Sequence, residues 1–303
     1  MEGSPDKLGV FSLQKKKERG EQITMLTAYD YPLAKLIDRA GVDIIFVSDA
    51  VGMVGLGYKN TLSVTMEEML HHTKAVTRAV ERAFVLACMP FMDYNTEHEA
   101  QANARRLIKE GGADAVEIEG GPEIIKITSS VVEAGIPVVA HIGLTRKFYS
   151  KYGKFQVQGR DAGSAMELIE LAMKLERVGA CAVTMECIPD RVAQIITEKL
   201  SIPTIGVGSG IYCDGQGLVT QDLLGLFEDF VPKFARQYAQ LAADISQALS
   251  LYKADVEGLK FPSTEHTFYM KEEELEHLQR LLRNKTRSLE LAKEEKQWGS
   301  GMR

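Results

Sequence analysis

Apolar and polar positions along the chain alternate between two kinds of segment. Short apolar runs rich in Val and Ile are separated by longer stretches in which apolar residues recur at helical spacing. This alternation is typical of repeated βα units around a parallel sheet. Seven strands are predicted from these runs, at residues 23–28, 43–48, 84–89, 115–119, 137–142, 182–186 and 203–207.

An eighth strand is expected at residues 218–226, where Gln221 and Asp222 interrupt the apolar run. Helices are expected between the strands. Several of them end in a charged residue followed by Gly, such as Glu110 and Gly111, because Gly readily ends a helix. The helices expected between strands cover residues 31–40, 65–80, 96–111, 123–134, 161–178 and 191–200.

A doubly wound open sheet would show the same alternation, so the choice depends on where polar residues fall. Asp49, Glu119, His141 and Glu186 each stand at the end of a predicted strand or directly after it. In closed barrels the chemistry gathers in the loops at the carboxyl ends of the strands. Eight units with this placement predict an α/β protein folded as a (β/α)8 TIM-type barrel.

The barrel is expected at about residues 20–258 of one domain, with its last helix at 234–256. Residues 1–19 form an N-terminal appendage, with a short helix expected at 12–19. Residues 259–303 form a C-terminal extension in which leucines lie close to helical spacing among many charges. This pattern predicts either a partner-facing helix or a solvated charged tail.

The composition is that of a soluble globular protein, with 45% hydrophobic and 26% charged residues in a chain of 303. The net charge is −6, and the scattered Lys and Arg residues lack the electrostatic footprint of a nucleic-acid binder. The N-terminus lacks the apolar stretch of a secretory signal, and no run approaches the roughly 18 apolar residues of a membrane span. We therefore expect a cytoplasmic protein with reduced cysteines and without nucleic-acid or membrane partners.

Three carboxylates, Asp49, Glu119 and Glu186, are the main candidates for chemistry. A buried carboxylate is costly unless a metal, a cation or a proton offsets its charge. Two of them could hold a hard cation such as Mg²⁺, which would chelate the oxygens of a 2-oxo acid and stabilise an enolate. The third could act as a base at carbon. The alternative is that these carboxylates bond loop amides.

Two further features lie at predicted strand ends. His141 could donate a hydrogen bond to a substrate oxygen or move a proton, and the alternative is a structural histidine. Residues 206–217, GVGSGIYCDGQG, form a glycine-rich loop where barrels often bind anions through backbone amides, although tight turns alone would also explain it. These features favour a small anionic substrate, with a keto acid as the leading candidate.

The motifs at these strand ends resemble the ketopantoate hydroxymethyltransferase family over about residues 12–268, and include VSDAVGM, VEIEGG, VVAHIGL, MECIP and IPTIGVGSG. This family is similar to the phosphoenolpyruvate mutase and isocitrate lyase group of barrels. The resemblance implies transfer of a one-carbon unit from 5,10-methylenetetrahydrofolate to 3-methyl-2-oxobutanoate. The product, 2-dehydropantoate, leads to pantothenate.

The resemblance also implies roles for individual residues. Glu186 corresponds to the glutamate that removes the C3 proton, after which the enolate attacks the carbon delivered by the folate. Asp49 corresponds to the first carboxylate ligand of Mg²⁺, and Glu119 to the carboxylate near the metal waters. His141 corresponds to the strand-end histidine of the family. Family members are homo-oligomers, typically decamers, and the same assembly is implied here.

Several positions depart from the family pattern. Cys88 stands where the family has the aspartate that is its second metal ligand, and a thiol is a poor ligand for Mg²⁺. Glu117 replaces a lysine that meets the substrate carboxylate, so an attractive charge becomes repulsive. Ala50 replaces a serine, and Ser48 replaces a glycine. Ser48, Ala50, Glu117 and His141 are the expected substrate-binding positions.

These departures leave two classes of function open. One is a hydroxymethyltransferase for this or another keto acid, with a metal site that is retained, rearranged with Asp93 as a ligand, or lost. The other is a catalytically silent barrel that binds or assembles with a partner, although the retained carboxylates favour catalysis. Two cysteine hypotheses also remain: a soft-metal site of Cys88, Cys187 and Cys213, and a nucleophilic thiol at Cys88.

Overall fold

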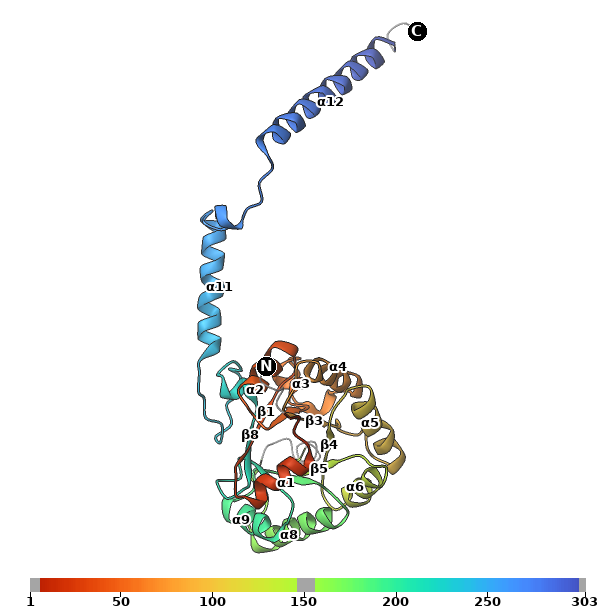
Figure 1. The fold of residues 1–303 in the computed structure, drawn as a ribbon, viewed down its shortest axis with the longest axis vertical. Coiled ribbons are helices and arrows are strands. Elements are labelled where there is room, and N and C mark those ends of the chain that lie inside the picture. Colours follow the sequence, from red (N-terminus) through yellow and green to blue (C-terminus); the bar gives the residue numbers. More distant parts are fainter. Residues whose placement is uncertain (1–5, 146–155, 300–303) are drawn as a thin grey trace. The chain divides into compact units, whose positions relative to one another are not determined.

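Eight parallel strands form the centre of a computed structural model that describes residues 6–145 and 156–299 (Figure 1). They are β1 (Ile23–Thr27), β2 (Ile44–Val47), β3 (Phe84–Cys88), β4 (Ala115–Glu119), β5 (Val138–Gly143), β6 (Ala182–Glu186), β7 (Thr204–Val207) and β8 (Gly215–Leu218). Neighbours in sequence pair in parallel, and β8 closes on β1, which confirms the predicted barrel. Strands β2, β3 and β4 are buried along their whole length, because a barrel covers both faces of its strands.

Most helices of the barrel pack around the outside of the strands (Figure 1). The threonines and the aspartate that precede α4, α5 and α8 each accept a hydrogen bond from a backbone N–H of the first turn. These caps explain why the helices start where the sequence predicts. Each helix expected between strands is confirmed to within three residues at either end. The elements are α1 (Val10–Glu18), α2 (Tyr31–Arg39), α3 (Val51–Val54), η1 (Thr61–Ser63), α4 (Met66–Thr77), α5 (Glu97–Lys109), α6 (Ile124–Glu133), α8 (Ala162–Arg177), α9 (Asp190–Lys199) and α10 (Thr220–Leu223).

The eighth strand lies earlier in the chain than expected. The prediction of 218–226 is wrong, because β8 ends at Leu218 and the following residues form the short helix α10. Thr220 fixes this change of direction by donating from its backbone N–H to Thr27 Oγ1 at 3.0 Å. The residue that opens β8 is Gly215, where a Cβ would come within 2.4 Å of the Ile23 carbonyl oxygen. The position of β8 is therefore determined by the close approach of its backbone to β1, and not by a run of apolar residues.

The helix expected at residues 234–256 begins instead at Leu241, as α11 (Leu241–Glu257). Backbone N–H groups at and before the start of α11 donate to carbonyls at the end of α10 and directly after it, rather than to carbonyls four residues back. Tyr238 donates to the Leu223 carbonyl at 2.8 Å, and Leu241 donates to the Leu224 carbonyl at 3.0 Å. These bonds hold the segment in an irregular conformation against the barrel.

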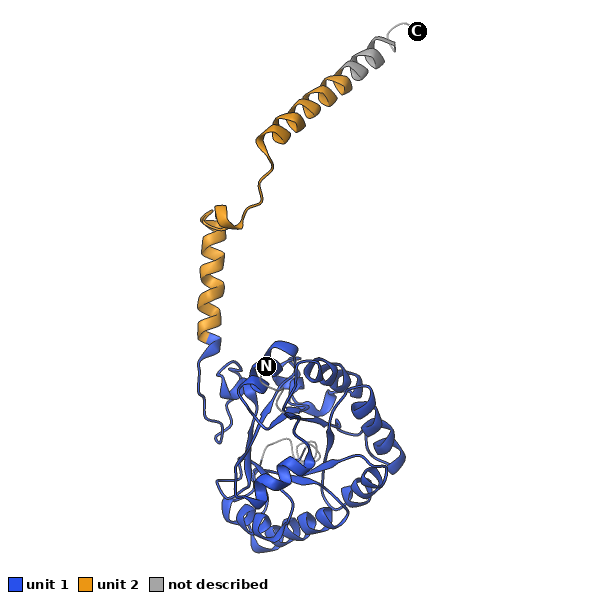
Figure 2. Ribbon diagram, viewed as in Figure 1, with its two compact units in different colours: residues 1–242 blue, residues 243–303 orange. Residues whose placement is uncertain are grey.

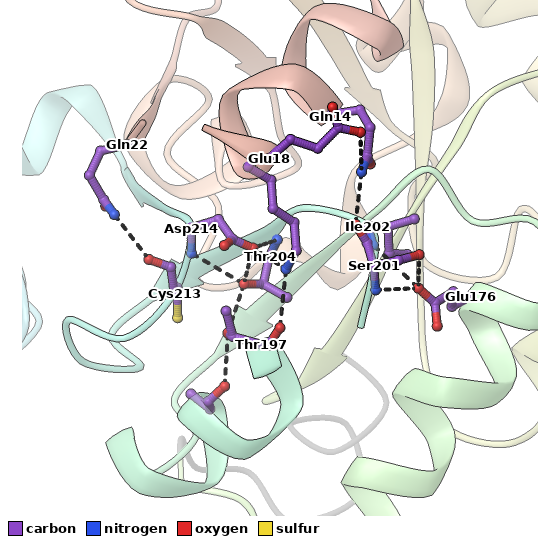
Figure 3. Close-up of polar contacts among 12 residues, drawn as sticks. Gln14, Glu18, Gln22, Glu176, Thr197, Ser201, Ile202, Thr204, Cys213 and Asp214 are labelled. Atoms are coloured by element: carbon purple, nitrogen blue, oxygen red, sulfur yellow. Dashed lines mark hydrogen bonds and ion pairs between the residues drawn. The ribbon is translucent and has the colours of Figure 1, made fainter. Parts of the chain in front are cut away.

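Helix α1 closes the amino-terminal end of the barrel. Lys16 Nζ and Lys17 Nζ each lie 2.8 Å from a carboxylate oxygen, of Asp43 and Asp214 respectively. Gln14 donates to the Ser201 carbonyl at 2.9 Å, and Figure 3 shows this bond beside the contacts among Thr197, Thr204 and Asp214. With this end closed, the carboxyl ends of the strands are left for a site.

The chain divides into two compact units, Met1–Ala242 and Ala243–Arg303 (Figure 2). The second unit contains most of α11, the turn η2 (Thr264–His266) and α12 (Glu272–Gly299). A helix at the leucine-rich stretch is thus present, and its exposed leucines include Leu278 and Leu282. In the part of the chain described, no helix has both the length and the apolar character needed to cross a membrane. The extent of the barrel domain, about 20–258, stays a prediction.

Candidate active site

A cavity of about 660 Å³ opens at the carboxyl ends of the strands. It lies within the first unit, and its wall draws on strand ends and loops around most of the barrel. The predicted site residues that line it are Ser48, Asp49, Ala50, Glu117, Glu119, His141 and Glu186. Cys88, the remaining one, is not among the lining residues. The structure therefore brings together seven of the eight positions singled out from the sequence, while their roles stay predictions.

Three carboxylates form an acidic floor in this cavity. Glu117 and Glu119 lie two residues apart on β4, so their side chains leave the strand on the same face. Asp49 follows the end of β2, where its carbonyl accepts from the Gly52 N–H at 2.9 Å and begins the turn into α3. All three carboxylates are buried. A site with this floor favours ligands that bring a cation or a hydrogen-bond donor.

Tyr29 positions the side chain of Ser48, the residue that precedes Asp49. Its hydroxyl lies 2.8 Å from Ser48 Oγ, and both residues are buried. Burial raises the pKa of Tyr29 above its ordinary value, so the phenol stays neutral and can donate. The sequence analysis missed this contact, although Tyr29 lies just beyond a predicted strand end.

His141 lies between two carboxylates. Its Nε2 is 3.0 Å from the Leu144 carbonyl and 3.2 Å from Glu186 Oε2, while its Nδ1 is 3.5 Å from Glu117 Oε1. Burial alone would lower the pKa of His141, but the carboxylates of Glu117 and Glu186 raise it well above its usual value. The raised pKa favours the protonated ring, in which Nε2 donates to the Leu144 carbonyl and Nδ1 faces Glu117.

Glu186 ends β6 at the wall of the cavity, and its side chain keeps 27% of its surface exposed. Its carbonyl accepts from the Leu144 N–H at 2.9 Å, which ties the loop after β5 to the end of β6. The next loop is also fixed, since Ser209 Oγ donates to the Met185 carbonyl at 2.7 Å. Glu186 thus presents its carboxylate to the cavity from a backbone that is fixed on both sides. This carboxylate contacts His141. That arrangement suits a base that acts on a bound small molecule.

The cysteine hypotheses do not fit the geometry. Cys88 is buried, and its Sγ donates to the Met89 carbonyl at 3.3 Å. Burial, with a smaller effect of the adjacent acid, raises the pKa of both Cys187 and Cys213 to about 12, so neither is a thiolate at neutral pH. Among the described residues, no three His, Cys, Asp or Glu side chains converge to hold a metal ion. The soft-metal site of Cys88, Cys187 and Cys213 is therefore wrong.

A magnesium ion fits the donor chemistry of the acidic floor. Asp49 and Glu119 supply hard oxygen ligands on the cavity wall, the kind that Mg²⁺ prefers. Mg²⁺ commonly takes one or two carboxylates and completes its shell with water and substrate oxygens. Asp93, the other candidate ligand, is not among the residues that line this cavity. The fit therefore rests on Asp49 and Glu119, and neither Cys88 nor Asp93 is among the lining residues.

Two parts of the cavity wall were not anticipated as site features. Asp222 lines it, and burial raises the pKa of this carboxyl to about 6. The segment after α10 adds Phe227, Phe230 and Phe234, which make one side of the cavity aromatic beside the charged floor. The spacing of the aromatic residues in FEDFVPKF is a signal that could have indicated an apolar wall.

The fold and the site together define an enzyme of the (β/α)8-barrel class, with its chemistry at the carboxyl ends of the strands. Solved structures with the same fold include phosphoenolpyruvate phosphomutase from Streptomyces platensis subsp. rosaceus, with a TM-score of 0.57 at 16% identity over 92% of this chain and 99% of that one. Another is 2,3-dimethylmalate lyase, a member of the PEP mutase/isocitrate lyase superfamily, with a TM-score of 0.50 at 13% identity over 95% of this chain and 100% of that one. These likenesses show the (β/α)8-barrel fold, as predicted.

Sequence comparisons identify the family. The model of the ketopantoate hydroxymethyltransferase family matches residues 7–264. The 3-methyl-2-oxobutanoate hydroxymethyltransferases of Thermoanaerobacter sp. (strain X514) and Clostridium novyi (strain NT) are 48% and 50% identical over 270 residues, which is 89% of this chain and 98% of each relative. The chain belongs to the ketopantoate hydroxymethyltransferase family and is an enzyme of this type.

Proposed function

We propose that this enzyme adds a hydroxymethyl group to 3-methyl-2-oxobutanoate, with 5,10-methylenetetrahydrofolate as the one-carbon donor, and so makes 2-dehydropantoate for pantothenate synthesis. The names of its relatives support this reaction. The observation that carries it is the position of Glu186. Its carboxylate lies on the wall of a cavity that also contains Asp49 and Glu119, and contacts His141 Nε2 at 3.2 Å.

The chain's own residues account for the proton transfer. Glu186 takes the proton from C3 of the keto acid, and the electron pair of that C–H bond moves into the C2–C3 bond and onto the keto oxygen. His141 stabilises the ionised form of Glu186 before the transfer through its Nε2–H. Water adds to the carbon carried by the folate, and both of its C–N bonds break, which releases tetrahydrofolate and leaves formaldehyde. C3 of the enolate then bonds the formaldehyde carbon, and the former carbonyl oxygen takes a proton to become the hydroxyl of the product.

Asp49 and Glu119 would hold Mg²⁺ in this proposal. The ion supplies Lewis-acid chemistry, which favours negative charge on the keto oxygen. Ser48 and Ala50 flank Asp49 and therefore border the keto acid, with Ser48 held by Tyr29. The aromatic wall has the chemistry to contact the ring system of a folate. We also expect a cytoplasmic homo-oligomer, which ultracentrifugation of the full chain would test.

The first experiment is isothermal titration of the metal-stripped protein with magnesium, in the presence and absence of 3-methyl-2-oxobutanoate. We expect each ligand to strengthen binding of the other, because substrate oxygens complete the metal shell. Product formation is then measured with 5,10-methylenetetrahydrofolate. If the keto acid neither binds nor reacts in the presence of magnesium, this function is wrong and other keto acids are tested in the same assay.

A further inference from the structure

Glu117, His141 and Glu186 form a continuous line of contacts across three neighbouring strands. Glu117 lies on β4, His141 on β5 and Glu186 at the end of β6. The imidazole nitrogens lie 3.5 Å from Glu117 Oε1 and 3.2 Å from Glu186 Oε2. Glu117 is only 1% exposed, so its contact with the ring is shielded from solvent. The ring therefore joins a buried carboxylate to one that is reachable from the cavity.

Each ring nitrogen faces groups that accept hydrogen bonds. The Leu144 carbonyl, 3.0 Å from Nε2, can only accept, so Nε2 carries a hydrogen. On the other side of the ring, Glu117 Oε1 faces Nδ1 at 3.5 Å, an ion-pair distance. A flip of the ring would exchange each nitrogen for a carbon and remove the contacts on both sides. The two carboxylates therefore define one orientation of His141.

We infer that Glu117 is a positioning residue that acts on the base Glu186 through His141, and this inference rests on the proposed function. Glu117 fixes the ring from the Nδ1 side, so that Nε2 stays bonded to the Leu144 carbonyl and 3.2 Å from Glu186 Oε2. Oε1 of Glu186 then remains for the C3 proton of the substrate. Without Glu117 the ring is held from one side only, and Glu186 loses its fixed orientation.

The same contact accounts for a negative charge at position 117. On the sequence alone, Glu117 is expected to repel the carboxylate of a keto acid. In the structure its Oε1 lies 3.5 Å from His141 Nδ1, so the carboxylate faces the ring. Its effect is therefore expected on turnover rather than on affinity for the keto acid.

The substitutions Glu117→Leu and Glu117→Gln form a matched pair. Both replacements are close to glutamate in size, but only glutamine keeps a polar oxygen that can face Nδ1. The readout is exchange of the C3 hydrogen of 3-methyl-2-oxobutanoate in D₂O, followed by proton NMR with magnesium chloride and without folate. We expect Leu to lower kcat about 100-fold with KM changed less than about threefold, and Gln to keep kcat within about fivefold.

A loss that falls on KM, or an equal loss of kcat for Leu and Gln, overturns the inference. Glu117→Leu leaves the buried His141 ring without its carboxylate neighbour, which can prevent folding. A second comparison, in which that ring is absent, avoids this problem. In a His141→Asn background, adding Glu117→Leu is expected to change kcat by less than about twofold, because the contact is already absent. A further drop of about tenfold would show that Glu117 acts by another route.

The two proposals fail in different ways. If the wild-type protein exchanges the C3 hydrogen while Glu117→Leu keeps full kcat, the inference is overturned and the proposed function stands. If the wild-type protein with magnesium neither binds the keto acid nor exchanges its C3 hydrogen, both are overturned. Thermal melts by circular dichroism confirm that each variant compared is folded.

Discussion

Gly143 on β5 is the register partner of Glu186 on β6, and the two backbones touch. A Cβ at position 143 would lie 2.2 Å from the Glu186 carbonyl oxygen. Gly143 also has φ +101°, a conformation that side chains disfavour. The backbone that carries the proposed base is therefore fixed by the absence of a side chain on the neighbouring strand.

The substitution Gly143→Ala is expected to displace Glu186 and lower kcat about 100-fold, because a shift of about 1 Å at a reacting group is enough for such a loss. We also expect it to lower the free energy of unfolding by about 2–4 kcal/mol through strain and overpacking. Urea unfolding and the C3 exchange assay measure these effects. Gly135→Ala is the matched control, since Gly135 has φ +83° with no atom within 4 Å of its Cβ position. The control is expected to cost about 1 kcal/mol and to keep full activity.

The substitution Glu186→Gln is expected to lower the rate of C3 exchange about 1,000-fold, because the amide cannot accept the proton. Affinity for the keto acid is expected to change little, since Glu186 is proposed to act on the proton and not to hold the substrate. Isothermal titration and NMR exchange separate the two effects. Glu170→Gln, an exposed position on α8, is the control. Retention of exchange in Glu186→Gln would assign the base to another residue.

Magnesium binding is expected to depend on Asp49 and not on Cys88. Asp49→Asn removes a charged oxygen ligand and is expected to weaken magnesium binding about tenfold or more. Cys88→Ser is expected to change the affinity less than about twofold, because Cys88 does not line the cavity. Calorimetric titration of both variants with magnesium chloride decides the point. Equal weakening in the two variants would place Cys88 at the metal.

Asp222 is expected to make stability depend on pH. Burial raises its folded pKa from 3.8 to about 6, so the folded state keeps a proton that the unfolded state releases above pH 4. Stability therefore falls as pH rises from about 4 to about 6, and this contribution is constant above that window. Asp222→Asn is expected to remove this loss and so to raise the free energy of unfolding by up to about 3 kcal/mol at pH 7.5, since one pKa unit is worth about 1.4 kcal/mol. Urea unfolding of both proteins at pH 4 and pH 7.5 measures the difference, which should be larger at pH 7.5.

Much of the barrel was predictable because local sequence signals act independently of tertiary contacts. The threonines before α4 and α5 cap those helices through bonds to glutamates three residues on. The eighth strand was missed because its sequence, GQGL, has little preference for a strand. It forms where the lack of side chains lets its backbone approach β1, and that approach is not visible from one segment.

The candidate site was predictable as a set of positions but not as a network. Strand ends in a barrel converge, so Asp49, Glu119 and Glu186 were expected to share one cavity. The pairing of Glu117 with His141 depends on the register of β4 and β5 and on side-chain direction, which the sequence does not specify. The role of Tyr29 depends in the same way on its distance from Ser48.

The closure of the barrel by helix α1 has a kinetic consequence. Lys16 and Lys17 hold that helix across the amino-terminal end, so small molecules enter and leave at the carboxyl end. Two reactants of unequal size that meet there share one route. In the proposed reaction, a keto acid at the strand ends would bind before the larger folate, and its product would leave after that folate. A single entrance to the barrel thus predicts that the two substrates bind in a fixed order.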